Sequence, residues 1–536
     1  MEITIREEGA AISASSVAER LLAEGLPGRL AAGDPTLWGA DAAAEAASRL
    51  GWLTLPLTSR ELLPEIGKLV EWARAQSLTN VVLAGMGGSS LAPEVICDSA
   101  DVPLTVLDTS DAAQVRRALN EDLERTVLVV ASKSGSTVET DSHLRVFETA
   151  FREAGIDPGD RIVIVTDAGS PLEHKAIESG YQHVLARSDI GGRYAALSAF
   201  GLVPSALAGA DVEKLLEEAE AVAPLLSREE GNPGFDLGCA IGGAALNGRD
   251  KLILEDQLSE ITGLPAWIEQ LVAESTGKAG RGILPVVAAE PNGASDELVV
   301  AIESDNGDVR VDGPLGAQFL VWEYATAVAC RLLEVNPFDQ PDVAEAKRNT
   351  AALLATQPVI NPPALVDGPV EVYGYTRATD LSGVLSELLA AVPDDGYLAV
   401  LAYLDRHAAF DAPVPEGADF EVMTDAWMAA DAATLRALLA LRTDRPVTFG
   451  WGPRYLHSTG QYHKGGPQNG VFVQLTGLVE HDVLVPGRPY SLGQLQFAQA
   501  LGDLEALAGR GRPAVRLHLT DRAAGVAHLL AAAQEA

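Results

Sequence analysis

Four hydroxyl side chains, one lysine and one glycine follow one another at the end of a predicted strand. The run Ser132-Lys133-Ser134-Gly135-Ser136-Thr137 comes after the apolar residues 127–131 and before Glu139. Backbone N–H groups at the start of a helix favour anions, and hydroxyls and an ammonium group add further donors. The run therefore predicts a site for a phosphate monoester. A well-capped helix is the alternative, although a cap uses one hydroxyl rather than four.

A glycine-rich turn precedes this loop in the chain. Gly85-Met86-Gly87-Gly88-Ser89-Ser90 stands between an apolar strand and the helix-like residues 93–96. Glycines at such a turn let a ligand approach the backbone closely. The turn is not a dinucleotide fingerprint, because Ser90 takes the third glycine position, and Leu91 excludes a nucleophile elbow. Asp108, at the end of the next strand, is all that keeps a nucleotide site open, and a tight turn without a ligand is the ordinary structural explanation.

Several residues further along have the chemistry of acids, bases and fixed cations. Gln270 and Glu274 are four residues apart, so on a helix they share one face. Arg193 follows two glycines, and Lys347 lies close to Glu345. A helix cap, a salt bridge between domains and a surface ion pair are the ordinary structural explanations of these residues.

Histidines raise the question of a metal site. His457 and His463 are close together, but neither an HExxH pattern nor a pair of closely spaced cysteines accompanies them. The sequence therefore predicts no metal.

The elements that position these residues form an alternating pattern. Short β-branched runs are separated by helix-like stretches, which indicates parallel sheets wound with helices on both faces. Strands are predicted at 81–84, 104–107, 127–131, 162–165, 183–185, 251–254, 285–288, 298–302, 398–401, 447–449 and 471–474. Helices are predicted at 191–209, 213–223 and 492–508. The predicted fold class is α/β, with two doubly wound units and a C-terminal α/β segment.

The expected domain boundaries follow from changes in this pattern. Residues 1–60 are rich in Ala and Leu with helical spacing and predict a helical N-terminal segment. Residues 61–215 and 216–360 each predict one doubly wound unit, and the Asn361-Pro362-Pro363 break begins a third domain at 361–536.

Composition restricts the class of protein. The 536 residues carry 39 Lys and Arg against 75 Asp and Glu, a formal charge of −36, which argues against nucleic acid or an anionic membrane as partner. The three separated cysteines do not form a disulfide scaffold and suit a reducing cytoplasm. The charged start, residues 1–10, lacks the apolar core of a signal peptide, and no run of 18 apolar residues predicts a membrane span.

Lysine is scarce, so a lysine within a motif is informative. The eight lysines are Lys68, Lys133, Lys175, Lys214, Lys251, Lys278, Lys347 and Lys464. Four of them fall in the candidate motifs, although each also has the ordinary explanation of a surface charge.

Taken together, six segments resemble the sugar isomerase (SIS) domains of the glucose-6-phosphate isomerase family. They are the glycine turn (82–96), the hydroxyl loop (130–140), Gly191-Gly192-Arg193-Tyr194 with residues 197–202, Gln270 to Lys278, Asn336 to Lys347, and Leu456 to Gln461. The segments extend over about 80–465, which is most of the chain.

The resemblance implies a role for each candidate residue. Glu274 would move a proton between two carbons, His457 with Lys347 would open the sugar ring, and Arg193 would stabilise an enediolate. The substrate-binding residues would be Gly87, Gly88, Ser89, Ser132, Lys133, Ser134, Thr137, Glu139, Gln270 and Gln340. The resemblance also implies a sugar-phosphate substrate, a cytoplasmic homodimer and no cofactor.

The order of two segments departs from the family pattern. In this family the histidine segment usually precedes the lysine segment, whereas here Lys347 precedes His457. The tail at 451–466 resembles the isomerase part of transaldolase–isomerase fusion proteins. The chain is too short to add a transaldolase barrel of about 250 residues to these segments, so it resembles that isomerase part alone. The altered order leaves open whether His457 acts in its own subunit or in a partner.

Two alternative functions are compatible with the sequence. An isomerase that also accepts mannose 6-phosphate would differ only in the shape of the pocket around C2 of the sugar. A non-catalytic phosphosugar-binding protein would keep the hydroxyl loop but would need neither Glu274, Arg193 nor His457.

Overall fold

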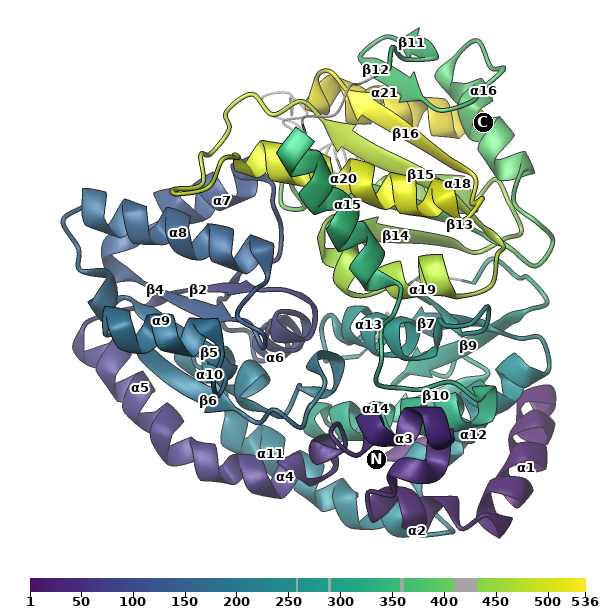
Figure 1. Cartoon of the computed structure of the whole chain (residues 1–536). Helices are drawn as coiled ribbons and strands as arrows, with labels where there is room; N and C mark the ends of the chain where they lie inside the picture. The colour runs from purple at the N-terminus through teal and green to yellow at the C-terminus, as the bar shows by residue number, and fades with distance from the viewer. Residues whose placement is uncertain (257–258, 288–290, 357–360, 409–430) are drawn as a thin grey trace, which may run out of the picture.

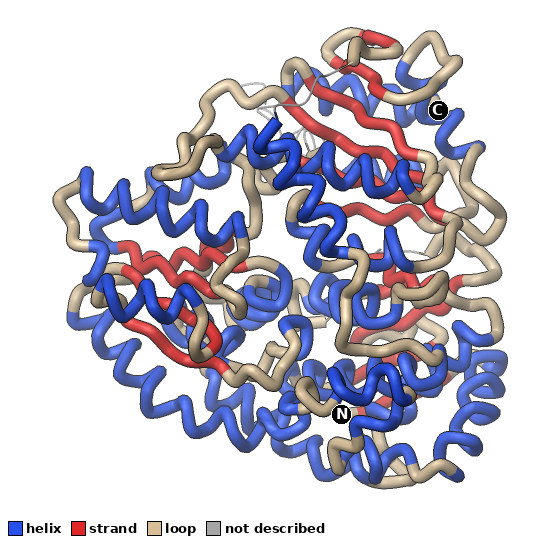
Figure 2. The backbone as a smooth tube through the Cα atoms, viewed as in Figure 1, coloured by secondary structure: helices blue, strands red, loops and turns tan. Residues whose placement is uncertain are grey.

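The computed structural model describes residues 1–256, 259–287, 291–356, 361–408 and 431–536. Three sheets carry the fold, and helices cover them (Figure 1, Figure 2). The α/β fold class with parallel sheets is confirmed. In the described part of the chain, no helix is long and apolar enough to cross a membrane.

The first sheet is parallel and has the order β3-β2-β4-β5-β6. Its strands are β2 (Asn80–Gly85), β3 (Thr105–Leu107), β4 (Thr126–Ala131), β5 (Ile162–Asp167) and β6 (Gln182–Ala186). Successive side chains point to opposite faces: Leu128 packs with one buried cluster and Val129 with another. Apolar residues at both positions let helices cover both faces. These helices are α5 (Leu63–Ala75), α6 (Leu91–Ser99), α7 (Ala112–Asn120), α8 (Val138–Glu153), α9 (Pro171–Ser179) and α10 (Ala199–Ala208).

The helix predicted at 191–209 is divided in the structure. A short 3-10 turn, η7 (Gly192–Tyr194), comes first, and α10 begins only after Ser198, whose side chain caps it by accepting from the N–H of Phe200. The hydroxyl cap explains the start of the helix. The interruption leaves Arg193 in a turn rather than on a helix face.

The second sheet has the order β1-β10-β9-β7-β8. Its strands are β1 (Glu2–Ile5), β7 (Lys251–Glu255), β8 (Leu284–Val287), β9 (Glu297–Ile302) and β10 (Val309–Asp312). The expectation of a helical segment at 1–60 is wrong at β1, which pairs antiparallel with β10. The alternation in Glu-Ile-Thr-Ile is a strand pattern too short to stand out beside the helices that follow.

Helices complete the first two units. The N-terminal ones are α1 (Glu8–Ala23), α2 (Leu26–Ala31), α3 (Ala40–Ala46) and α4 (Leu55–Thr58). Those around the second sheet are α11 (Val212–Val222), α12 (Pro233–Leu246), α13 (Leu264–Thr276), α14 (Leu315–Leu333) and α15 (Val343–Thr356). The acidic helix predicted at 213–223 is α11.

The third sheet has the order β11-β12-β16-β15-β13-β14, with parallel pairing from β16 to β14 and antiparallel pairing at β11 and β12. Its strands are β11 (Leu365–Asp367), β12 (Val370–Tyr373), β13 (Tyr397–Tyr403), β14 (Val447–Trp451), β15 (Gly470–Gly477) and β16 (Ala514–Leu519). Its helices are α16 (Leu381–Ala390), α18 (Thr434–Ala440), α19 (Gly460–Gly465), α20 (Leu492–Gly509) and α21 (Arg522–Glu535). Figure 1 shows α15 beside α20, so the helix with Lys347 lies against the third segment.

Candidate active site

Glu274 and Arg193 meet in the interior. Helix α13 places Gln270 and Glu274 on one face, and Gln270 Nε2 donates to Glu274 Oε2 at 3.2 Å. The turn η7 brings Arg193 Nη1 to 3.3 Å from Glu274 Oε1. The side chains are only 3% and 8% exposed. A carboxylate and a guanidinium are therefore held side by side, largely away from water.

The guanidinium of Arg193 also holds the segment that leads to Lys347. Its Nη1 donates to Gln340 Oε1 at 2.9 Å, and its Nη2 donates to the carbonyls of Pro337 at 2.5 Å and Asp339 at 3.1 Å. Its Nε donates to Ser275 Oγ at 2.8 Å. Every nitrogen of the guanidinium thus donates to a protein group, so a substrate that bound Arg193 would have to share or displace one of these contacts.

His457 reaches this site within a single chain. It closes the 3-10 turn η9 (Arg454–His457), and its carbonyl oxygen accepts from Gln270 Nε2 at 2.8 Å. Its ring nitrogen Nε2 lies 3.3 Å from Glu139 Oε1. One glutamine therefore bridges the backbone of the histidine segment to Glu274, and no partner subunit is required to bring these groups together.

The contact with Glu139 determines where the imidazole carries its proton. Burial raises the pKa of Glu139, but the charge of His457 and its hydrogen bond lower it more, so the pKa falls from 4.5 to about 2. An ionised carboxylate only accepts hydrogen bonds, so Nε2 carries a proton. In the neutral ring Nδ1 is then left as the base. Gln499 Nε2 also donates to Glu139 Oε1, at 2.6 Å.

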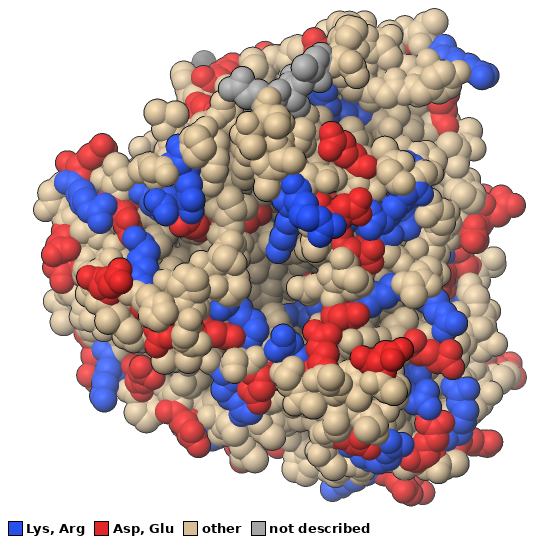
Figure 3. Space-filling model, in the orientation of Figure 1, with Lys and Arg blue, Asp and Glu red and all other residues tan. Residues whose placement is uncertain are grey.

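A cavity of about 190 Å³ lies beside this pair. His457, Glu139 and Gln499 line it, together with Lys347 of α15 and Thr137 of the hydroxyl loop. Lys347 is exposed, and its charge contributes to the lowered pKa of Glu139. Figure 3 shows a face hollowed near its centre, with Lys and Arg side chains around the hollow although the whole chain is strongly acidic.

The hydroxyl loop leads into α8 as the sequence predicts. Thr137 is the N-cap residue, but its side chain makes no capping hydrogen bond, and its Oγ1 lies 3.1 Å from Ser132 Oγ. Ser134 and Ser136 are paired at 2.9 Å. Capping therefore does not explain the hydroxyl of Thr137, and the first N–H groups of α8 remain suited to an anion.

Lys133, the cation of this loop, is held by protein groups. Its Nζ lies 2.7 Å from Asp167 Oδ2 and donates to the carbonyl of Ser188 at 2.9 Å. Contact with a phosphate would require this ammonium to leave or share Asp167. The role of Lys133 in substrate binding thus stays a prediction.

The glycine turn is packed against protein. A Cβ on Gly88 would lie 1.9 Å from the carbonyl oxygen of Gly192, and one on Gly87, whose φ is +57°, would lie 2.7 Å from Gln270 Nε2 and 3.0 Å from the His457 carbonyl oxygen. Ser89 is buried at the same turn. The sequence predicts that these glycines let a ligand approach the backbone closely. In the structure, their missing side chains let the turn that carries Arg193 and the segment that carries His457 pack against the backbone.

The structure also assigns two residues that the sequence left open. Asp108 is buried and lies 3.0 Å from Arg454 Nη1, so it forms an ion pair and is not exposed for a nucleotide ribose. His463 is buried, its Nδ1 lies 2.9 Å from the hydroxyl of Tyr397, and burial holds its pKa well below 6.5. Within the described residues, no group of three His, Cys, Asp or Glu is arranged to hold a metal.

Comparison with known proteins agrees with the motifs. The sequence model of the phosphoglucose isomerase family matches residues 66–280. A probable glucose-6-phosphate isomerase of Haloarcula marismortui is 34% identical over 226 residues, which cover 41% of this chain and 50% of that protein. A glucose-6-phosphate isomerase of Rubrobacter xylanophilus is 29% identical over 383 residues, covering 56% of this chain and 88% of that protein.

The resemblance to the glucose-6-phosphate isomerase family is thereby confirmed. The chain spans about half the length of the first curated relatives that it matches. Among solved structures, a glucose-6-phosphate isomerase from Chlamydia trachomatis aligns with a TM-score of 0.48 at 19% identity, over 59% of this chain and 75% of that one.

Proposed function

We propose that this protein interconverts glucose 6-phosphate and fructose 6-phosphate. The observation that carries the proposal is the buried approach of Arg193 Nη1 to Glu274 Oε1 at 3.3 Å, joined to His457 through Gln270. An aldose–ketose isomerisation needs a carboxylate beside the carbon that loses its proton and a fixed cation beside the oxygen that gains charge. The sequence matches to isomerases of this name support the choice of substrate.

Ring opening is the first step of the proposed reaction. The Nδ1 of neutral His457 accepts the proton of the C1 hydroxyl as the C1–O5 bond breaks, and the imidazolium then gives that proton to the ring oxygen, which returns the imidazole to its neutral form. Ionised Glu139 keeps the other proton on Nε2 and holds the ring in place. Lys347, which lines the same cavity, supplies positive charge near the atoms that exchange protons.

Proton transfer between the carbons follows in the open chain. Glu274 removes the proton from C2, the electrons of that bond form the C1–C2 double bond, and the charge of the former carbonyl falls on O1. Arg193, whose Nη1 lies 3.3 Å from Glu274 Oε1, stabilises this enediolate oxygen with its fixed positive charge. The proton of the C2 hydroxyl then moves from O2 to O1, and Glu274 returns the carbon-bound proton at C1 while C2–O2 becomes the carbonyl of the ketose.

The phosphate is assigned to the hydroxyl loop. Ser132, Ser134 and Thr137 stand at the start of α8 together with its first N–H groups. The turn that packs against the segments of Arg193 and His457 is formed by Gly87, Gly88 and Ser89. The side chain of Gln340 accepts a hydrogen bond from Arg193 and so holds the guanidinium in place.

The proposal extends to domains and to location. Residues 361–536 form a third domain that completes the active site, because they contribute His457 and Gln499. The three cysteines are free and buried, which suits a reducing cytoplasm. A homodimer is part of the same proposal, by analogy with the family.

A coupled assay of the purified chain tests the function. Glucose 6-phosphate should yield fructose 6-phosphate at a saturable rate, and the rate with mannose 6-phosphate, measured in parallel, decides between a strict and a dual isomerase. Absence of product from both sugars, in a folded preparation that binds them, would favour the non-catalytic phosphosugar-binding alternative.

A further inference from the structure

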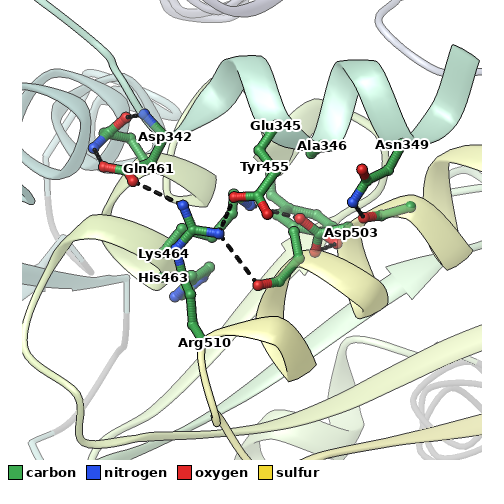
Figure 4. A network of polar contacts seen from close by, with 12 residues as sticks. Asp342, Glu345, Ala346, Asn349, Tyr455, Gln461, His463, Lys464, Asp503 and Arg510 are labelled. Carbon is green, nitrogen blue, oxygen red and sulfur yellow. Dashed lines mark hydrogen bonds and ion pairs between the residues drawn. The ribbon is translucent and has the colours of Figure 1, made fainter.

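A buried carboxylate on α20 joins the two sides of the histidine segment (Figure 4). Asp503 is fully buried, and its Oδ2 accepts the hydroxyl of Tyr455 at 2.6 Å. Its Oδ1 accepts from Lys464 Nζ at 2.5 Å. Tyr455 lies two residues before His457 in η9, and Lys464 lies after His457 in the chain, on α19. The carboxylate therefore restrains the backbone on both sides of His457.

The same helix face also holds the partner of the imidazole ring. Gln499 is four residues before Asp503, so both side chains point to one side of α20. Gln499 donates to Glu139, and Glu139 contacts the ring of His457. One face of α20 thus sets both the backbone position of His457 and the direction of its ring.

Helix α20 is fixed in turn against the helix that bears Lys347. Asn349 Nδ2 donates to the carbonyl of Gly502 at 3.2 Å, and just beyond the helix ends Arg510 Nη2, after α20, lies 2.9 Å from Asp342 Oδ1, before α15 (Figure 4). A Cβ on Gly502 would lie 2.9 Å from the backbone nitrogen of Thr350, so the two helices touch through backbone. Helix α20 therefore contacts both the helix that bears Lys347 and the segment that bears His457.

We propose that Asp503 is a positioning residue for His457, acting through Tyr455 and Lys464. The inference rests on the proposed isomerase function for its kinetic part. A buried ion pair generally gives little stability beyond what apolar side chains of similar volume would give. Asp503 contacts residues on both sides of His457, so its ion pair with Lys464 can hold the imidazole in position. Such positioning matters because a small displacement of a catalytic group slows proton transfer strongly.

Three variants separate positioning from stability. Tyr455→Phe removes one restraint and keeps the aromatic ring in place. The double variant Asp503→Leu with Lys464→Met replaces the buried ion pair by apolar groups and leaves no unpaired charge. Ser491→Ala is the control: it removes the capping box of the same helix without touching Asp503. Thermal unfolding of all three identifies the preparations that are folded.

The kinetic test compares glucose 6-phosphate with erythrose 4-phosphate, an aldose phosphate that cannot close a ring. Tyr455→Phe and the double variant should lower kcat on glucose 6-phosphate by about 10- to 100-fold, with KM nearly unchanged and a much smaller loss on the open-chain sugar. Ser491→Ala should keep the rates of the wild type. Equal losses on both sugars, or no loss in Tyr455→Phe, would overturn the proposal.

A spectroscopic test does not depend on the reaction. Histidine labelled with ¹³C at Cε1 gives one NMR signal for His457, which His457→Asn identifies by its disappearance. The signal should shift or broaden in Tyr455→Phe and in the double variant, and it should stay unchanged in Ser491→Ala. If wild-type protein failed to convert glucose 6-phosphate, the proposed function would fail while this measurement still tested positioning. An unchanged His457 signal in both network variants would contradict positioning.

Discussion

Glu139 Oε1 and His457 Nε2 lie 3.3 Å apart, although 318 residues separate them in the chain. The contact therefore joins helix α8 of the first unit to the histidine of the third segment within one chain. Although Lys347 precedes His457 in the chain, the structure brings Glu139, His457, Gln270 and Glu274 together.

Replacement of His457 tests its role in ring opening. His457→Asn keeps a group that can donate to Glu139 but has no base, so we expect a loss of about 10²-fold or more on cyclic glucose 6-phosphate. The loss on erythrose 4-phosphate should be much smaller. His174→Asn, at an exposed position on α9, is the control. Equal losses on the two substrates would remove His457 from ring opening.

The glycine turn should tolerate no side chain at Gly88. A methyl group there would overlap the Gly192 carbonyl, so Gly88→Ala should displace the arginine turn, reduce activity strongly and lower the unfolding temperature. Gly67→Ala, on α5 with no atom within 4 Å of the added carbon, should be neutral or stabilising by about 0.5–1 kcal/mol. Thermal unfolding and rate measurements on both variants check the contrast. Wild-type activity in Gly88→Ala would show that the turn can relax.

Lys278 should impose an alkaline limit on activity. Burial lowers its pKa from 10.5 to about 8, with a further contribution from the charge of Arg193, while its ion pair with Asp339 at 2.8 Å opposes the change. Below about pH 8 the ion pair of Lys278 with Asp339 is intact. It holds Asp339 in place, and the backbone carbonyl of Asp339 accepts a hydrogen bond from Arg193. As pH rises through about 8 the pair is lost, so kcat should fall.

Stability should change in the opposite direction over that range. Because the folded-state pKa of Lys278 is the lower one, the unfolded chain binds more protons between about pH 8 and 10.5, and this residue makes unfolding less favourable as pH rises. Rate and unfolding profiles of wild type and Lys278→Arg, which stays charged, check both trends. If kcat fell at the same alkaline pH in Lys278→Arg as in the wild type, the fall would arise from the titration of another group.

Lys133→Ala distinguishes a phosphate contact from a structural ion pair. If the ammonium contacts the phosphate, KM should rise more than kcat falls, by an amount corresponding to about 1.5–3 kcal/mol. Asp167→Asn, which releases Lys133 from its carboxylate, should lower KM. Initial rates over a range of glucose 6-phosphate concentrations give both constants. An unchanged KM in both variants would limit Lys133 to its pair with Asp167.

The sequence predicted the parallel interior of each sheet better than the edges. Runs such as Val127–Ala131 stand out because strands buried on both faces are continuously apolar. The antiparallel edge strands β1, β11 and β12 are short and partly polar, so they carry no comparable signal. The predicted strand end at Ala288 lies outside the described residues.

The site was predicted where a motif was local and was missed where it depended on packing. Gln499 and Asp503 belong to none of the resembling segments, and their polar side chains on an apolar helix were the available signal. The close approach of Gly88 to Gly192 requires the tertiary structure, because the two residues come from different turns. The ion pair of Lys133 with Asp167 likewise joins two strand ends.

The measurement that tests the central claim most directly follows the proton at C2. Wild type and Glu274→Gln are incubated with glucose 6-phosphate in D₂O, and ¹H and ¹³C NMR follow the formation of fructose 6-phosphate and the entry of deuterium at C2 of the glucose phosphate. We expect both processes in the wild type and a loss of about 10²–10⁴-fold in Glu274→Gln, with sugar-phosphate binding retained by calorimetry, because the amide has the size of the carboxylate but cannot act as a base. Activity of Glu274→Gln within a factor of a few of the wild type would contradict the account.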